Sequence, residues 1–267
     1  ALLAAPAAVA VAGVVLRALE ASGFAAEVEA GGLATTTGVT AFEGVATGLR
    51  AGLPALALVS AGVASQALAG ELARGTLRNV LLRPVTRSHV VLGKGLALLG
   101  ATAAGYVLVV AAAFAAATVA FDFTDVTEIL FNGQRFPLVA ADALWPPLRE
   151  ALWRPLPALA AVALVGLLAG ALTRGAAAAL SLALALVVGP DVLRSVLRGF
   201  DLEWVVPAAH LPSPLGDTSY VAHFLDLARG VSNAVAAGGP STWAVPLAWA
   251  LLAAALSVLA VRRRSVR

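Results

Sequence analysis

Long apolar blocks with few charges inside them constrain this chain more than any other feature of its sequence. The block from Val90 to Ala120 carries a single charged residue, Lys94. A helix of about 20 residues, rising about 1.5 Å per residue, crosses a hydrocarbon core about 30 Å thick. Only 12% of the 267 residues are charged, whereas a soluble domain carries roughly 25%. The sequence therefore predicts an integral membrane protein and excludes an ordinary water-soluble fold.

The number of these blocks predicts an all-α integral membrane protein with six transmembrane helices, forming one domain over residues 1–267. The first block is short and the chain has no methionine, so we expect it to be the end of a helix that starts upstream. The hydrophobic region of a signal peptide is the alternative. Pro190 is expected to break or kink the fifth helix. The spans are expected at about residues 1–19, 52–70, 89–120, 155–173, 176–193 and 243–261.

The distribution of charge predicts which helix ends face the cytoplasm. Ten of the 18 Lys and Arg residues fall on one side of the predicted spans with Glu71 as the only acid, and the other side has eight basic and 14 acidic residues. An excess of Lys and Arg marks cytoplasmic segments. We therefore expect a multi-pass protein of the plasma (inner) membrane, with both termini and the 71–89 loop in the cytoplasm. The segments at about 20–51, 121–154 and 194–242 are then external.

The predicted external segments are too long to be simple turns, and four of the five tryptophans lie in them or directly at their edge: Trp145, Trp153, Trp204 and Trp243. Tryptophan is enriched at the membrane–water interface, so we expect these segments to meet the membrane surface. The stretch from Trp145 to Trp153 fits a short helix that begins at a proline and lies on that surface. An ordered loop is the alternative.

The predicted spans carry no ionisable side chain near their centres, where proton-coupled transporters, voltage sensors and intramembrane proteases place them. The three histidines lack the spacing of metal ligands, and no phosphate-binding loop motif occurs. We therefore expect a protein that is not an enzyme and binds no metal or cofactor itself. Polar residues at depth are expected to hydrogen-bond between helices. They are Gln66, Thr102, Tyr106, Thr118 and Ser181.

One stretch has the small-residue spacing of closely packed helices, with Gly166 and Gly170 four positions apart. This spacing is typical of membrane helix dimers. Because Ala and Gly are abundant throughout the chain, we interpret the match as background composition and not as a dimer motif.

The segment from Gly70 to Lys94 is specific enough to suggest a function. At 100° per residue, Glu71, Arg74 and Arg78 share one face of a helix, and apolar residues occupy the opposite face. The sequence therefore predicts a short amphipathic helix at about 71–83 on the cytoplasmic surface, joining spans two and three. A basic interfacial helix bound to anionic lipid is the alternative.

The same segment resembles the hallmark of ABC-2 type permeases, the membrane subunits of one class of ABC transporter, most often exporters. Permeases for multidrug and antibiotic export and for nitrous-oxide-reductase maturation are similar at this hallmark. The family also has a Gly-Lys pair opening the third helix. The residues that carry the resemblance are Glu71, Gly75, Thr76, Leu77, Arg78, Leu81, Leu82, Pro84, Val85, Arg87, Gly93 and Lys94.

This resemblance implies that the predicted amphipathic helix is a coupling helix, which docks into a cleft of a separate cytoplasmic ATPase. Glu71, Arg74 and Arg78 would face the ATPase. Gly75 would let the two backbones approach closely, and Pro84 would fix the bend into span three. Two permeases and two ATPases would form the transporter, with ATP and Mg²⁺ bound by the ATPases.

The expected function is the permease subunit of an ABC exporter, which forms the translocation path while its partner hydrolyses ATP. Its expected partners are the ATPase, a second copy of this chain and membrane lipids, but not nucleic acid. The alternative is a non-transporting membrane anchor or assembly factor whose basic helix recruits a cytoplasmic protein or anionic lipid. Spans rich in Ala, Leu and Val suit an amphipathic or lipid-like cargo.

Overall fold

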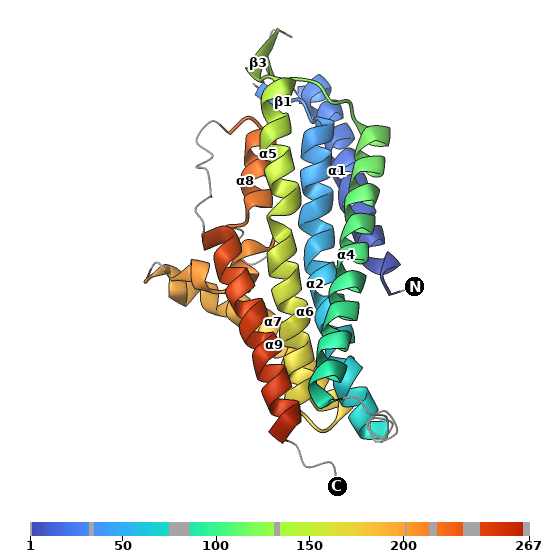
Figure 1. The fold of residues 1–267 in the computed structure, drawn as a ribbon. Coiled ribbons are helices and arrows are strands. Elements are labelled where there is room, and N and C mark those ends of the chain that lie inside the picture. Colours follow the sequence, from blue (N-terminus) through green and yellow to red (C-terminus); the bar gives the residue numbers. More distant parts are fainter. Residues whose placement is uncertain are drawn as a thin grey trace.

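The protein is an elongated bundle of long helices that run side by side (Figure 1). The structure is a computed structural model that describes residues 2–31, 35–74, 86–130, 134–200, 202–213, 218–231 and 241–263. Its helices are α1 (Ala4–Gly31), α2 (Ala41–Arg74), α4 (Arg87–Ala120), α5 (Ala141–Trp153), α6 (Pro155–Leu172), α7 (Ala176–Arg198), α8 (Tyr220–Ala228) and α9 (Ser241–Arg263). Two short 3-10 turns, η1 (Glu203–Val205) and η2 (Pro207–His210), follow α7. The helical architecture expected from the apolar blocks is confirmed.

Five helical stretches in the described part of the chain are long and apolar enough to cross a membrane, which gives the protein a multi-pass character. They are Ala4–Gly23, Ala41–Glu71, Arg87–Ala120, Ala141–Leu172 and Trp243–Arg263. The remaining predicted span falls on α7, whose apolar part, Ala176–Pro190, is shorter. The helix continues through Pro190 to Arg198, and charged residues beyond the proline end its apolar part. A count of six spans therefore stays a prediction.

The stretch from Trp145 to Trp153 lies within helix α5, so the helical alternative is confirmed. It does not lie apart on the surface: α5 continues directly into α6 as one column in Figure 1. Leu144, Leu148 and Ala151 are buried, and their spacing places them on one helix face. Because that face is buried, α5 packs against the other helices and runs along the bundle.

Helix α2 is the centre of the bundle and packs against α1, α4, α6, α7 and α8. Glycines on successive turns bring its neighbours close. A Cβ atom added at Gly48 would lie 2.8 Å from the Cβ of Ala113 on α4, and one at Gly52 would lie 2.9 Å from the Cβ of Ala10 on α1. Cβ atoms do not approach this closely, so these glycines set the spacing between α2 and its neighbours.

Helix α6 meets α2 backbone to backbone at Gly166 and Gly170. A Cβ at Gly166 would lie 2.5 Å from the carbonyl oxygen of Ala61, and one at Gly170 would overlap the carbonyl of Ser65. The glycine pair therefore forms a close helix–helix contact within the chain, as small residues allow, and the interpretation that it is not a dimer motif stays a prediction. The spacing of Gly166 and Gly170 indicates a helix face without side chains, but it does not identify the helix that packs against that face.

A small antiparallel sheet departs from the predicted all-α class. Strands β1 (Thr35–Thr37), β2 (Val126–Leu130) and β3 (Arg135–Val139) pair in the order β1-β2-β3. They lie at the end of the bundle opposite the C-terminus (Figure 1). The sheet joins two predicted external segments that are far apart in sequence, so no local pattern revealed it.

An aromatic cluster packs the bundle just below this sheet. The centre of the Phe42 ring, at the start of α2, lies 4.9 Å from the ring centre of Phe123 and 5.1 Å from that of Trp145, and both pairs pack edge to face. Phe123 in turn stacks on Phe114 of α4 and on Trp145 of α5. Such pairs add about 0.5–1.5 kcal/mol beyond the area that they bury. The cluster therefore fixes the ends of α2 and α4 against α5.

Candidate functional site

The residues of the family hallmark surround the connection between α2 and α4. Glu71 and Arg74 belong to the last turn of α2, which continues without a break into the first residues of the predicted coupling helix. Arg87, Gly93 and Lys94 lie on the first turns of α4. The other hallmark residues lie outside the described residues. They are Gly75, Thr76, Leu77, Arg78, Leu81, Leu82, Pro84 and Val85.

The structure brings Glu71 and Lys94 together across the two helices. Nζ of Lys94 lies 2.6 Å from a carboxylate oxygen of Glu71 and also donates a hydrogen bond to the carbonyl oxygen of Ala67, at 2.7 Å. Both side chains are partly exposed, at 29% for Glu71 and 22% for Lys94. A partly exposed pair contributes about 0.2–1 kcal/mol to stability, so its main effect is to fix the end of α2 against α4.

The start of α4 is capped by a side chain. The Thr86 hydroxyl accepts a hydrogen bond from the backbone N–H of His89 and lies 2.8 Å from Nδ1 of the His89 ring. Threonine is a favoured N-cap residue because its oxygen satisfies a free N–H of the first turn. The cap places the helix start at Arg87, close to the limit expected from the apolar block.

Further hydrogen bonds tie α7 and α9 to the same end of the bundle. Nε of Arg262 on α9 donates to the Ser88 hydroxyl at 2.8 Å, and the Gln66 amide on α2 donates to the carbonyl of Ala176 on α7 at 2.8 Å. The predicted interhelical role of Gln66 is confirmed. That of Tyr106 is also confirmed, since its hydroxyl donates to the carbonyl of Leu152.

Not every polar residue at depth bonds between helices. The Thr118 hydroxyl donates to the carbonyl of Ala115 in its own helix, at 3.0 Å. Prediction of an interhelical bond was wrong for this residue, because a threonine hydroxyl can reach a carbonyl of its own preceding turn. Ser257 on α9 does the same with the carbonyl of Ala253.

We call this end of the molecule, where α4 is joined to α2 and α9 and α2 is joined to α7, the basic end. In Figure 1 it is the lower end, with the C-terminus. Glu71, already paired with Lys94, is the only acid among the charged residues described there. The basic residues in the described ranges at this end are Arg74, Arg87, Lys94, Arg174, Arg262 and Arg263. This surface therefore suits an acidic protein surface or anionic lipid headgroups.

The opposite end contains a buried carboxylate that the sequence analysis did not single out. The Glu43 side chain is 3% exposed, and one of its oxygens lies 2.9 Å from Nε of Arg17 on α1 and 2.8 Å from Nε of Arg229 after α8. Thr40 and Glu43 have the spacing of a capping box at a helix start, and the N–H of Glu43 donates to the Thr40 hydroxyl at 3.5 Å. This signal predicts a helix start, but the two arginine partners come from distant segments.

A second polar cluster joins α8 to the junction between α5 and α6. The guanidinium carbon of Arg154 lies 4.3 Å from the centre of the Tyr220 ring, and its Nε lies 2.8 Å from a Glu150 oxygen. His223 packs beside Tyr220 with the ring centres 5.6 Å apart. Burial lowers the pKa of His223, the nearby Asp226 carboxylate partly opposes this shift, and Arg154 adds to it. Burial also raises the pKa of Tyr220.

Both clusters join segments that are distant in the sequence. Within the described ranges, no group of three or more His, Asp or Glu residues lies close enough to hold a metal ion. The basic end is the candidate surface for a functional interaction: Arg87 and Lys94 flank the connection from α2 to α4, and Arg174, Arg262 and Arg263 are exposed.

Comparison with known proteins adds no assignment to this geometry. No family model matches the chain, and no curated protein matches it. The functional interpretation therefore depends on the residues of the basic end and on the resemblance of the 70–94 segment to ABC-2 type permeases.

Proposed function

We propose that this chain is the permease subunit of an ABC transporter of the ABC-2 type, an exporter that works with a separate cytoplasmic ATPase. The observation that carries the proposal is the ion pair between Glu71 and Lys94, 2.6 Å apart. Both residues belong to the hallmark, and they hold the two helices that flank the proposed coupling helix. A force applied to that connection would reach α2 and α4 together.

The packing of α2 supports this interpretation. Movement at its basic end would affect α1, α6, α7 and α8, which pack along its length. Interfaces between packed helices transmit rigid-body shifts because they have few intermediate arrangements. The ties from Gln66 to α7 and from Arg262 to α4 would include the remaining helices in the same motion.

The proposed arrangement in the membrane follows the charge. With the basic end in the cytoplasm, the excess of Lys and Arg lies inside, as expected for a protein of the plasma membrane. The sheet, the aromatic cluster and the Glu43 cluster would then lie outside. A pair of permeases, proposed to be a homodimer with six spans each, would assemble with two ATPases that bind ATP and Mg²⁺.

Co-purification tests this proposal directly. The full chain is purified gently from native membranes, and the proteins and lipids that accompany it are identified and counted. We expect one ATPase for each permease in a complex that contains two of each. An unrelated protein or anionic lipid alone would contradict the proposal and favour the membrane-anchor alternative.

Substitutions in the proposed coupling helix separate these two functions. Gly75→Leu leaves the charge unchanged but would block close docking, so we expect it to reduce ATPase co-purification and substrate-stimulated ATP hydrolysis. In a lipid-binding helix, the same change would be neutral or favourable, whereas each lost cation would cost about 1 kcal/mol. The proposal fails if Gly75→Leu has no effect while Arg78→Gln only weakens binding to anionic vesicles.

A further inference from the structure

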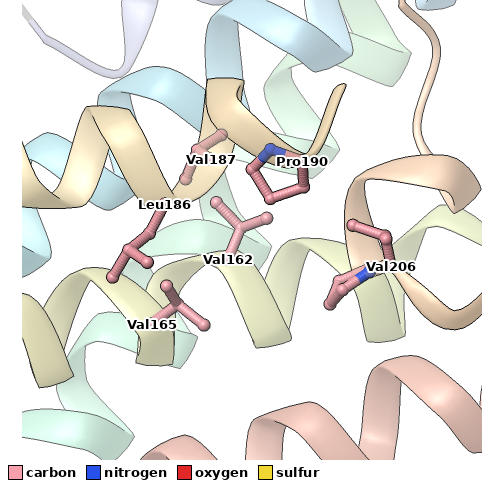
Figure 2. A pocket seen from close by; sticks show the side chains of 7 residues that line it. Val162, Val165, Leu186, Val187, Pro190 and Val206 are labelled. Carbon is pink, nitrogen blue, oxygen red and sulfur yellow. The ribbon is translucent and has the colours of Figure 1, made fainter. Parts of the chain in front are cut away.

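A cavity lined by apolar and aromatic side chains lies among α6, α7, η2 and α9. Its volume is about 260 Å³. A narrower crevice beside Pro190 of α7 shares part of its wall, including Val165 and Leu186 (Figure 2). Ala253 and Leu256 of α9 form the facing wall. Pro190 of α7 and Pro207 of η2 line the part of the space between α7 and α9.

The chemistry of the walls decides what can fill the cavity. A water molecule needs two to four polar partners, and apolar cavities of this kind stay dry. The indole N–H of Trp249, which lines the cavity, already donates to the carbonyl of Val205 at 2.8 Å. An empty apolar cavity destabilises a protein in proportion to its volume. An apolar occupant is therefore favoured.

The cavity is continuous with a surface suited to contact lipid. Leu252 and Leu256 line it and are 50% and 41% exposed, and α9 is one of the helices that are apolar enough to cross a membrane. Trp204 and Trp243, on the neighbouring η1 and on α9, are also exposed. Because tryptophan favours the headgroup level, the cavity lies on the hydrocarbon side of a membrane interface.

We infer that this cavity binds one hydrocarbon chain of a membrane phospholipid, with the headgroup left outside at the level of the tryptophans. The hydrocarbon chain of the lipid enters between α7 and α9 and fills the space beside Val165, Pro190 and Ala253. Such a lipid acts as part of the packing between α6, α7 and α9. The cavity and its lipid-facing rim favour such a lipid whether or not this protein is a transporter.

Photo-crosslinking tests this inference on the full chain. The protein is reconstituted into vesicles of phosphatidylcholine and phosphatidylglycerol that contain a phosphatidylcholine with a diazirine near the end of one acyl chain. After illumination, labelled residues are mapped by mass spectrometry. We expect label on the interior wall at Val165 and Ala253, of which Ala253 is only 2% exposed. Label on Leu251, which is 72% exposed, serves as the reference for bulk lipid.

Filling the cavity distinguishes a bound chain from bulk lipid. Ala253→Phe should remove the label from Val165 and leave that on Leu251 unchanged. Ala255→Phe is the matched control, because Ala255 is on the same helix and exposed, and it should keep both labels. Val165→Phe, from the opposite wall, is a second filling variant in case Ala253→Phe does not fold, and it should remove the label from Ala253.

Two results would overturn the inference. One is a wild-type protein labelled at Leu251 but not on the interior wall, as expected if a second copy of the chain covers the cavity. The other is interior label that persists in folded protein of either filling variant. Gel filtration and thermal unfolding followed by tryptophan fluorescence establish that each variant is folded.

Discussion

Lys94 on α4 reaches across to α2, where its Nζ lies 2.6 Å from a Glu71 oxygen and 2.7 Å from the carbonyl oxygen of Ala67. The lysine thus joins the beginning of one long apolar helix to the end of the preceding one. The residues between these helices form the proposed contact with an ATPase. Lys94 therefore fixes the distance between the end of α2 and the start of α4, beside the segment on which the ATPase is proposed to act.

Exchanging the two charges tests this relationship. Glu71→Lys and Lys94→Glu each place like charges together, and we expect each to reduce substrate-stimulated ATP hydrolysis by the reconstituted complex. Stability should fall by only about 0.2–1 kcal/mol, because the pair is partly exposed. The double exchange should recover part of the activity.

The control for this exchange is Arg263→Glu, which makes the same charge change as Lys94→Glu on an exposed residue at the same end. It should reduce activity less than Lys94→Glu does. A double exchange no more active than either single variant would show that the pair does not matter for coupling.

The contact between α6 and α2 predicts an unusual sensitivity to a single methyl group. Gly170→Ala would push a Cβ atom into the backbone of Ser65, and such overpacking costs about 1–3 kcal/mol. Gly100→Ala on α4 is the matched control, because nothing lies within 4 Å of its added Cβ. That change should be neutral or stabilise the helix by up to about 1 kcal/mol.

Thermal unfolding followed by tryptophan fluorescence measures both glycine variants. We expect a clearly lower Tm for Gly170→Ala and an equal or higher Tm for Gly100→Ala. Equal effects of the two substitutions would contradict the close backbone contact between α6 and α2.

The buried carboxylate of Glu43 predicts a large loss of stability on neutralisation. Glu43→Gln leaves Arg17 and Arg229 without their shared negative partner, and breaking a buried pair costs about 3–5 kcal/mol. We expect a somewhat smaller loss, because the arginine side chains are 25% and 37% exposed.

Glu20→Gln is the control for this cluster, since Glu20 is 69% exposed and lies 3.4 Å from the same Arg17. An exposed pair contributes about 0–1 kcal/mol. Denaturant or thermal unfolding should therefore rank the two variants far apart, and similar losses would rule out a special role for Glu43.

Orientation can be measured with single cysteines, since the chain has none of its own. Thr124→Cys and Arg263→Cys place thiols at exposed positions at opposite ends of the bundle. In intact cells whose outer face is accessible, an impermeant thiol reagent should label position 124 and not position 263. Reversed labelling would contradict the cytoplasmic assignment of the basic end.

A cysteine at Ser213 provides the control for accessibility. This residue falls in the external segment predicted at 194–242 but is 5% exposed. It should therefore stay unlabelled in folded protein and react only after unfolding. Labelling of Ser213→Cys in the folded state would contradict the burial of this residue.

The environment of His223 predicts a loss of stability in mild acid. Burial lowers the pKa of this side chain in the folded state, so the unfolded chain, with a histidine pKa of about 6.5, binds the proton more readily. Stability should then decrease as pH falls from about 6.5 through the lower folded-state value. Between pH 7.5 and pH 5.5, the Tm of the wild type should fall further than that of His223→Gln. Equal falls in Tm would exclude His223 as the cause of the acid sensitivity.

The sequence by itself determined the helices whose cause is local. Uninterrupted apolar residues predicted α4, α6 and α9 close to their observed limits, because a helix satisfies its backbone hydrogen bonds within one segment. The Thr86 cap and the proline before Leu156 each fix a helix start, and both effects are local because they involve only the first turn of the helix. The resemblance to ABC-2 type permeases singled out Glu71 and Lys94 one by one, but it could not pair them.

Only the tertiary structure decided what depends on residues far apart in the chain. Arg229 reaches Glu43 across 186 positions, and strands β1 and β2 come from two separate predicted external segments. The glycine pair on α6 acquired its role only when α2 was placed against it. Sequence patterns report which face of an element is apolar, small or charged, whereas the partner of that face is fixed when all the helices pack together.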